Sequence, residues 1–247
     1  MHALGIDIGG SGIKGAVVDI KSGELENKRH RIPTPQPSKP EAVAEVICQI
    51  AEFFEWAGPI GCGYPGVVQH GVTRTAANVD DGWLNFDASL YLSAQIGDNP
   101  VTVINDADAA GLAEMHFGVG QEWQRGVAVL VTIGTGLGTA VFTNGQLVPN
   151  TELGHIEIDG HDAELHATDA ARKREDMSWK EWAGHFNRYL TTLEKYLSPD
   201  VFILGGGASK KVEKYLPYLT TRAKVVPALL RNEAGIIGAA LATTLPQ

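Results

Sequence analysis

A carboxylate in this sequence occupies a position at which it could act as a general base. Asp106 follows Asn105 and the apolar run 101–104, where a buried strand is expected to end and a helix to begin. Such a carboxylate can face a cleft and accept a proton from a substrate hydroxyl, and phosphoryl transfer needs little more than that base, Mg²⁺ and charge-neutralising donors. Asp106 is therefore the predicted base. The simpler interpretation is a helix cap, which Asn and Asp often provide, and Asp108 would point away from Asp106 on a helix.

A Gly-rich segment near the N-terminus could bind phosphate. Residues 10–15 match the dinucleotide pattern G-x-G-x-x-G, but an apolar strand rather than a helix is expected after them, so we reject a Rossmann site. The segment is predicted to be a hairpin whose backbone N–H groups can face phosphate. The residues predicted for this role are Gly9, Gly10, Ser11, Gly12 and Lys14, with Asp7 holding Mg²⁺ directly or through a water. An ordinary glycine hairpin is the alternative.

The same pattern recurs 125 residues later, with Thr132 in the place of Asp7. A strand over 127–132, a Gly-rich turn and a strand over 140–143 indicate an internal duplication. Two such hairpins could hold a phosphate donor from both sides, which resembles the actin-like ATPase fold of sugar kinases and chaperones. The predicted phosphate contacts here are Thr132, Gly134, Thr135, Gly136 and Gly138. Gly205, Gly206 and Gly207 follow a later strand and could contact a nucleotide, or could simply form a tight turn.

A Glu and a His three residues apart suggest sugar recognition. Glu152 and His155 can share a face and hydrogen-bond neighbouring sugar hydroxyls, and Glu164 is a third candidate. Metal binding is the usual rival for such a pair. Only His161 and Asp162 lie near them in the sequence and no Cys does, so we expect no zinc site.

Basic residues gather in a few places along an otherwise acidic chain. The 247 residues carry a formal charge of −9, which argues against a general nucleic-acid binder. A polyanionic donor would need several cations along one groove. The candidates are Arg172, Lys173, Arg174, Lys210 and Lys211, although a run such as 172–176 is usually a solvated helix end.

The composition indicates a folded protein that acts in a reducing compartment. A hydrophobic fraction of 44% allows a sizeable core, and no apolar run reaches the length of a membrane span. Two cysteines are too few for a disulfide scaffold, and no signal peptide is expected at the start. We therefore expect a cytoplasmic protein. Capping-box patterns at Ser38/Glu41 and Ser178/Glu181 predict helices to about residues 56 and 197, and residues 69–99 show no strong period.

Taken in order, these motifs resemble those of the ROK family (repressors, open reading frames, kinases). The resemblance rests on motifs spread over nearly the whole chain: Asp7–Gly10 with Lys14, Gly63–Gly66, Asn105–Ala110, Thr132–Gly138 and Glu152–His155. It implies that Asn105 and Asp106 hold a sugar, with Asp106 as base for its 6-hydroxyl. The other implied sugar contacts are Asn78, Glu152, His155 and Glu164, with Gly66 in the same motif set.

One departure from the family pattern is informative. Many members carry a Cys-rich zinc motif between the Gly-His pair and the next Glu, but residues 156–163 contain no Cys. The segment Arg172–Trp179 is similar to a signature of the polyphosphate glucokinases and glucomannokinases of actinobacteria. The resemblance implies phosphoryl transfer to glucose from inorganic polyphosphate, often with ATP as well, and leaves mannose open as an acceptor.

The expected architecture is an α/β protein of actin-like (ribonuclease H-like) fold with two duplicated domains around a cleft. The N-terminal domain would cover residues 1–108, with helix 235–247 packing back onto it, and the C-terminal domain 109–234. We expect a monomer or homodimer with no nucleic-acid or membrane partner. The rivals are a strictly ATP-dependent glucokinase, a sugar-responsive regulator, for which six residues before Asp7 leave no room for a helix-turn-helix, and an actin-like filament or chaperone ATPase.

Overall fold

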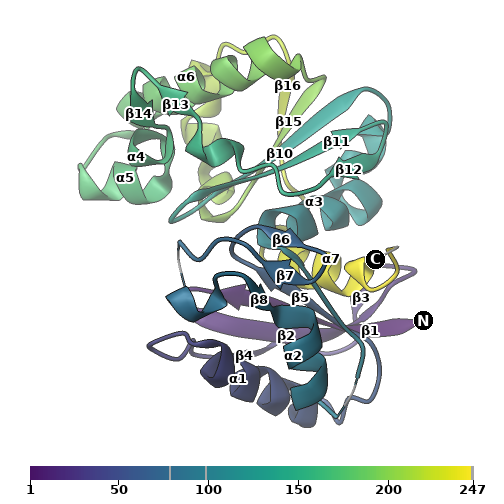
Figure 1. The fold of residues 1–247 in the computed structure, drawn as a ribbon. Helices are drawn as coiled ribbons and strands as arrows, with labels where there is room; N and C mark the ends of the chain where they lie inside the picture. The colour runs from purple at the N-terminus through teal and green to yellow at the C-terminus, as the bar shows by residue number, and fades with distance from the viewer. Residues whose placement is uncertain (78, 98, 246–247) are drawn as a thin grey trace. The chain divides into compact units, whose positions relative to one another are not determined.

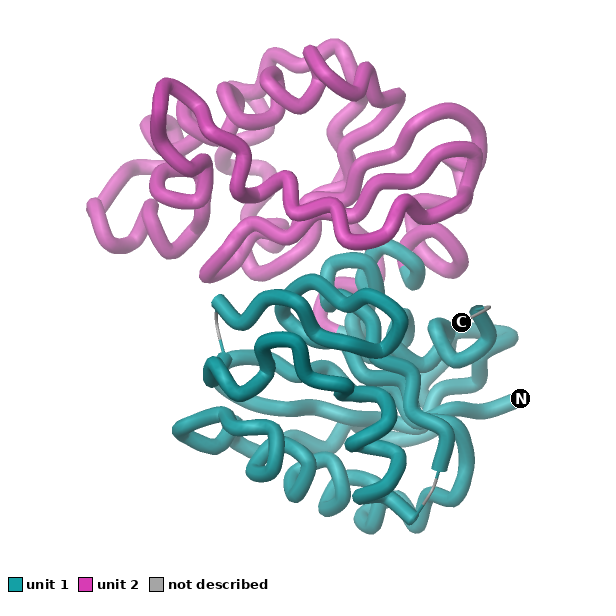
Figure 2. The backbone as a smooth tube through the Cα atoms, in the orientation of Figure 1, with its two compact units in different colours: residues 1–113, 233–247 teal, residues 114–232 magenta. Residues whose placement is uncertain are grey.

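The computed structural model describes residues 1–77, 79–97 and 99–245. The chain forms two compact units, which are described separately (Figure 2). Unit 1 comprises Met1–Ala113 and Glu233–Gln247, and unit 2 comprises Glu114–Asn232. The domain limits expected from the sequence stay a prediction.

The sheet of unit 1 starts from the N-terminal hairpin (Figure 1). Strands β1 and β2 pair antiparallel, and β5 and β9 extend the sheet in parallel from β1, giving the order β3-β2-β1-β5-β9 with β4 also on β2. A strand follows the first Gly-rich turn directly, which confirms that this is a hairpin and not a Rossmann turn. The strands are β1 (His2–Gly9), β2 (Gly12–Asp19), β3 (Glu24–Leu25), β4 (His30–Ile32), β5 (Ile60–Tyr64) and β9 (Val101–Asn105).

Helix α7 (Ala234–Ala242), at the C-terminal end of the chain, packs on strands β1 and β5. A Cβ at Gly5 would lie 2.0 Å from the carbonyl oxygen of Ile236, and one at Gly61 1.7 Å from that of Ala239. Only glycine lets the helix backbone approach the strands this closely. The small residues of α7 are nearly all buried for the same reason.

The first of the two predicted capping boxes is wrong. Helix α1 (Pro40–Phe53) begins after Lys39, and no side chain caps it. Pro40 occupies the first turn, where its fixed φ suits a helix start and its missing N–H leaves one fewer donor to satisfy. Ser38 is buried, and its carbonyl accepts a hydrogen bond from the indole N–H of Trp83 at 2.8 Å.

Among its described residues, the segment without a clear period contains short elements, none longer than eight residues. Its strands form a separate three-stranded sheet in the order β6-β7-β8. Two-residue strands are too short to show an alternating pattern. The elements are β6 (Val68–Gln69), β7 (Val72–Thr73), η1 (Asp81–Trp83), β8 (Phe86–Asp87) and α2 (Ala88–Gln95).

Unit 2 repeats the strand order of unit 1, which confirms the predicted duplication. Its sheet runs β12-β11-β10-β15-β16, with β10 and β11 antiparallel and β15 and β16 in parallel with β10. Asp7 pairs in register with Gly63, and Thr132 pairs with Gly205. Asp7 and Thr132 therefore occupy equivalent positions in the two sheets. The strands are β10 (Val127–Ile133), β11 (Leu137–Thr143), β12 (Gln146–Val148), β15 (Val201–Gly205) and β16 (Lys224–Pro227).

Helix α6 (Trp179–Leu197) contributes many of the buried side chains in the hydrophobic core of unit 2. Ser178 and Glu181 form the predicted capping box at its start. Trp182, Phe186 and Tyr189 are fully buried on its inner side. The remaining elements of this unit and those that join the units are α3 (Asp106–Phe117), η2 (Val119–Trp123), η3 (Leu153–His155), β13 (Glu157–Ile158), β14 (His161–Asp162), α4 (Glu164–Ala167), α5 (Asp169–Arg174), η4 (Gly207–Lys214), η5 (Leu216–Tyr218) and η6 (Arg231–Glu233).

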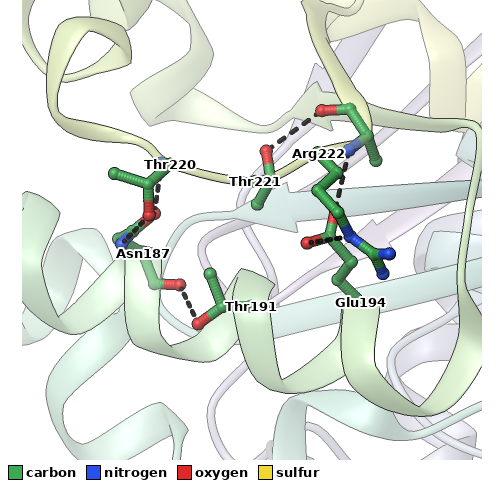
Figure 3. Close-up of polar contacts among 7 residues, drawn as sticks. Asn187, Thr191, Glu194, Thr220, Thr221 and Arg222 are labelled. Carbon is green, nitrogen blue, oxygen red and sulfur yellow. Dashed lines mark hydrogen bonds and ion pairs between the residues drawn. The ribbon is translucent and has the colours of Figure 1, made fainter.

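The loop that leads into β16 is fastened to α6 by side chains (Figure 3). The buried carboxylate of Glu194 accepts a hydrogen bond from the backbone N–H of Ala223 at 2.7 Å, and Asn187 accepts one from that of Thr220 at 2.7 Å. These bonds replace water for two backbone donors and fix the entry into the last strand of the sheet. Within the described part of the chain, no helix has both the length and the apolarity to cross a bilayer.

Candidate active site

The first Gly-rich hairpin places an ammonium against a carboxylate. Asp7 and Lys14 are register partners on β1 and β2, and Lys14 Nζ lies 2.9 Å from Asp7 Oδ2. Both side chains are partly exposed. The tip of the hairpin, Gly10–Ser11, is exposed as well. A Mg²⁺ ion held by Asp7 would share that carboxylate with Lys14.

Two side chains that the sequence did not single out for the site hold this hairpin. Arg31 Nη2 donates to the carbonyl of Ser11 at 2.6 Å, and its guanidinium fills the space that a Cβ at Gly12 would need. The hydroxyl of Thr34 donates to the carbonyl of Gly9. These two bonds hold the backbone of the hairpin through its carbonyl oxygens. The sequence offered no signal for the role of Thr34, and for Arg31 it offered only the positive charge.

Asn105 acts as the cap of helix α3. Its side-chain oxygen accepts from the backbone N–H groups of Ala107 and Asp108 at 2.9 and 3.0 Å, and its NH₂ donates to the carbonyl of Gly66 at 3.1 Å. The capping interpretation is therefore confirmed for Asn105. The bond to Gly66 ties the 63–66 motif to the start of the helix, and the predicted sugar contacts of both residues stay predictions.

Asp106 is the first residue of α3 and is partly exposed, whereas Asp108 is buried. A Cβ built on Gly63 would lie 3.6 Å from the Cα of Asp106, so strand β5 runs close beside the helix start. Asp7, Tyr64 and Asn105 stand at the carboxyl ends of three neighbouring parallel strands. This edge is where open α/β sheets bind their ligands.

The second Gly-rich hairpin turns tightly between β10 and β11. Thr132 faces Gly138 in register, and the N–H of Gly134 donates to the carbonyl of Gly136 at 3.0 Å. Thr135 is exposed at the tip. The N–H of Gly134 is thus bonded within the turn, and the predicted phosphate contacts of this hairpin stay predictions.

The third Gly-rich segment lies against the second one. Gly206 has φ +75°, and a Cβ there would lie 2.5 Å from the backbone of Ile133. Gly207 is exposed, with open space where a Cβ would be. The tight-turn interpretation is therefore confirmed for Gly206, and the predicted nucleotide contact of residues 205–207 stays a prediction.

The Glu-Leu-Gly-His motif packs on the second hairpin. A Cβ at Gly154 would lie 1.9 Å from the carbonyl oxygen of Leu137, so a side chain there is excluded. The N–H of Leu153 also donates to the hydroxyl of Thr139 on β11 at 3.0 Å. Glu152 and His155, which flank these residues, are exposed. The glycine of the motif is needed to bring both side chains next to the hairpin.

His155 is paired with an acid that the sequence mentioned only as a possible metal ligand. Its Nδ1 lies 2.9 Å from Asp162 Oδ2. Partial burial favours the neutral ring, but the hydrogen bond to Asp162 and the charges of Glu164, Asp162 and Glu152 outweigh it, so the pKa of His155 is raised. His155 is thus held in an acidic setting.

Glu164 connects the candidate sugar contacts with the hairpin. Its Oε1 accepts a hydrogen bond from the N–H of Leu137 at 2.5 Å, and its own N–H donates to Asp162 Oδ1 at 2.8 Å. The structure therefore brings His155, Glu164 and the second Gly-rich hairpin into one group within unit 2.

The basic run 172–174 is largely occupied by local partners. Arg172 bonds to Asp169 at 2.9 Å and lies over the ring of Trp179, and Lys173 Nζ lies 2.7 Å from the same carboxylate. Arg174 donates to the carbonyl of Leu165 at 2.7 Å. Lys210 and Lys211 are exposed on η4. A polyphosphate contact by any of these residues stays a prediction.

Two further predictions concern residues away from these groups. The proposed sugar contact Asn78 lies outside the described residues. Among those that are described, one trio of potential metal ligands has its ligand atoms within 4.8 Å of one another, namely His2, Asp19 and Glu26. His2 and Asp19 pair at the opposite end of β1 and β2 from Asp7 and Lys14.

Comparisons with known proteins identify the family of the chain. The family model described as "ROK family" matches residues 3–168. The chain is 49% identical to a polyphosphate glucokinase of Mycobacterium tuberculosis, over 98% of this chain and 91% of that protein. It is 50% identical to the solved structure of an inorganic polyphosphate/ATP-glucomannokinase from Arthrobacter sp. strain KM, with a TM-score of 0.93 and 98% of each chain covered.

A more distant structure extends the likeness in fold. A ROK family glucokinase from Streptomyces griseus, solved in complex with glucose and AMPPNP, is 23% identical with a TM-score of 0.82, and covers 97% of this chain and 98% of its own. The fold is the actin-like ATPase fold of the ROK sugar kinases, as expected from the repeated hairpins. This chain belongs to the ROK family.

Proposed function

We propose that this chain is a polyphosphate-dependent glucokinase, which transfers a phosphoryl group from inorganic polyphosphate to the 6-hydroxyl of glucose. The observation that carries the proposal is the 49% identity, over nearly the whole chain, to a polyphosphate glucokinase. The 50% identity to a polyphosphate/ATP-glucomannokinase supports ATP as a second donor and mannose as a second acceptor.

Asp106 is the proposed general base. Its position at the start of α3, partly exposed at the carboxyl edge of the parallel strands, suits a carboxylate that takes a proton from a bound hydroxyl. The oxygen of the sugar hydroxyl, as it loses its proton to Asp106, then attacks the terminal phosphorus of the donor in line with the leaving phosphate. Asn105 supports this role because its side chain fixes the first turn of the helix.

Backbone N–H groups of the two Gly-rich hairpins, with Lys14, are the proposed stabilisers of phosphate charge. Preorganised donors of this kind stabilise the transition state most when water is excluded. Asp7 offers the oxygen ligand that Mg²⁺ prefers, and its Oδ1 is not the atom that Lys14 contacts. Mg²⁺ bound there would neutralise charge on the donor phosphates.

Glu152, His155 and Glu164 are the proposed sugar contacts of unit 2, and Asn105 and Gly66 those of unit 1. A carboxylate accepts two sugar hydroxyls, and an imidazole with one protonated nitrogen accepts a third. Arg172, Lys173, Arg174, Lys210 and Lys211 are the proposed contacts of a long polyanion, and Gly205–Gly207 are the proposed contacts of an adenosine. The two cysteines are unpaired, which suits the cytoplasm proposed for this enzyme.

The test is an assay of glucose 6-phosphate formation by the purified protein. Nucleotide-free enzyme is given polyphosphate alone, ATP alone, or both, each with glucose and then with mannose. We expect product from polyphosphate alone. Product from ATP but none from polyphosphate would support the strictly ATP-dependent rival, and no product from either donor would overturn the proposal.

A further inference from the structure

Asp162 stands at the centre of the candidate sugar contacts in unit 2, although it is not itself one of them. Its two carboxylate oxygens have separate partners: Oδ2 contacts Nδ1 of His155, and Oδ1 accepts the backbone N–H of Glu164. Glu164 in turn accepts the N–H of Leu137 in the Gly-rich hairpin. These hydrogen bonds form a continuous series that links His155, Asp162, Glu164 and Leu137 within unit 2.

We propose that Asp162 is a positioning residue for hexose recognition, which orients the ring of His155 and the carboxylate of Glu164 against the second Gly-rich hairpin. This inference rests on the proposed function, since it assigns His155 and Glu164 to the sugar.

The first part of the proposal follows from the hydrogen-bonding capacity of a carboxylate. An ionised carboxylate only accepts hydrogen bonds, so the proton of a neutral His155 must sit on Nδ1. Nε2 then carries a free lone pair and can accept a hydrogen bond from a sugar hydroxyl. Without Asp162 the ring could adopt either tautomer, and the Nε2–H tautomer would present a donor instead of an acceptor.

The second part concerns the position of Glu164. Asp162 Oδ1 holds the N–H of Glu164 at 2.8 Å, at the first residue of α4, while Glu164 Oε1 bonds to the hairpin at 2.5 Å. Glu164 is thus held at two points, its backbone N–H and its side-chain Oε1. The second oxygen, Oε2, is left to face a sugar hydroxyl, so the sugar and the hairpin share one rigid carboxylate.

The charges around His155 make the proposal measurable. Glu152 before η3, Asp162 on β14 and Glu164 on α4 all face the ring and favour its protonated form. Protonation removes the acceptor at Nε2, so we expect kcat/KM for glucose to fall as the pH drops through the raised pKa of His155.

Asp162→Asn separates the two functions of the residue. An amide keeps an oxygen for the N–H of Glu164 but offers an NH₂ to His155, which would leave the proton on Nε2. We expect ¹⁵N NMR of the imidazole to show the Nδ1–H tautomer in the wild type and the Nε2–H tautomer in the variant, with a lower pKa. KM for glucose should rise about tenfold, which corresponds to the loss of one hydrogen bond between neutral groups, with KM for the donor unchanged.

Asp159→Asn is the matched control. Asp159 lies in the turn of the same β13–β14 hairpin, pairs with Arg188, and has φ +56°, a conformation that Asn adopts readily. The control should leave the tautomer, the pKa of His155 and KM for glucose as in the wild type. If the Asp162→Asn variant gave the same three results as the Asp159→Asn control, the proposal would be overturned. A changed tautomer with an unchanged KM for glucose would overturn it as well.

A measurement on the wild-type protein keeps the proposal testable if Asp162→Asn does not fold. Addition of glucose should shift the ¹⁵N resonance of Nε2 of His155 and leave Nδ1 protonated. A proton on Nε2 in the free protein would contradict the proposal. A wild type that makes no glucose 6-phosphate would contradict the proposed function instead, and the tautomer would still report on Asp162.

Discussion

The guanidinium carbon of Arg172 lies 4.2 Å from the centroid of the Trp179 ring, while its Nε bonds to Asp169 at 2.9 Å. Arg172 is therefore held between an aromatic face and a carboxylate, with only 20% of its side chain exposed. Such a cation contributes to packing, in contrast to Lys173, whose side chain is 68% exposed. The two neighbours should respond differently to substitution.

We predict that the pair Arg172→Ala with Lys173→Ala weakens polyphosphate use more than ATP use, because a polyanion needs more cations than a short nucleotide donor. Lys173→Ala alone should change the donor ratio with a smaller loss of stability than Arg172→Ala, because its side chain is mostly exposed. Arg172→Ala alone should lower the free energy of unfolding by about 1–2 kcal/mol through the lost stacking and hydrogen bonds. The ratio of kcat/KM for the two donors and thermal unfolding measure both effects. Equal losses for the two donors would show that the cluster is purely structural.

Asp169 should make stability depend on pH. Partial burial opposes ionisation, but hydrogen bonds from Lys173 and Arg172 outweigh it and lower the pKa below its ordinary value of 3.8. A lowered pKa gives stability that is present above the ordinary value and is lost as the pH falls through the lowered one. Asp169→Asn should therefore be less stable than the wild type at pH 7, by about 1 kcal/mol.

The comparison needs urea unfolding of both proteins from pH 7 down to the most acidic pH at which they stay folded. The gap between them should narrow toward low pH. Asp176→Asn, at an exposed position with φ +49°, is the control and should track the wild type. A gap that stays constant with pH would refute the ion pairing as its cause.

Glu114 is fully buried and serves three backbone donors. Its carboxylate accepts the N–H groups of Val119, Leu229 and Leu230 at 3.1, 3.1 and 2.7 Å. Glu114→Gln would turn one oxygen into an NH₂ that faces an N–H group, so we predict a loss of about 2–3 kcal/mol in the free energy of unfolding. Glu122→Gln, an exposed change on η2, should have little effect. Denaturant unfolding of both variants decides, and equal stabilities would exclude this role of Glu114.

Two glycine-to-alanine changes should have opposite effects on the stability of the protein. Gly154→Ala places a Cβ 1.9 Å from the carbonyl of Leu137 and must displace the hairpin, so both stability and glucose turnover should fall. Gly184→Ala, on the exposed side of α6 with open space around it, should stabilise by about 0.5–1 kcal/mol. Thermal unfolding and glucose kinetics check both. A Gly154→Ala variant with normal KM and stability would show that the motif tolerates a side chain.

The sequence predicted the duplicated sheets because their strands are long enough to show an apolar run on each side of a Gly-rich turn. Register pairs such as Asp7 with Gly63 and Thr132 with Gly205 place the predicted loops at equivalent strand ends. The contact of Gly206 with Ile133, by contrast, requires tertiary packing, and only its glycine hinted at a close approach.

The partner of His155 could not be predicted in the same way. Asp162 reaches it through β13 and β14, which are two residues each and carry no periodic signal. The failed capping box at Ser38 has a similar cause: the buried indole of Trp83, 45 residues away, takes the Ser38 carbonyl, and Pro40 starts the helix instead. Local patterns predict local structure, whereas these contacts depend on distant segments.

The most direct test of the proposed chemistry is the turnover of Asp106→Asn with glucose and polyphosphate. An amide cannot take the hydroxyl proton, so we predict that kcat falls by about 10²–10⁴-fold or more while the melting temperature and glucose binding are retained. Asp87→Asn, at the cap of helix α2 where Asn caps equally well, should keep wild-type turnover. Near-normal turnover in a folded Asp106→Asn protein would contradict the assignment of Asp106 as the base.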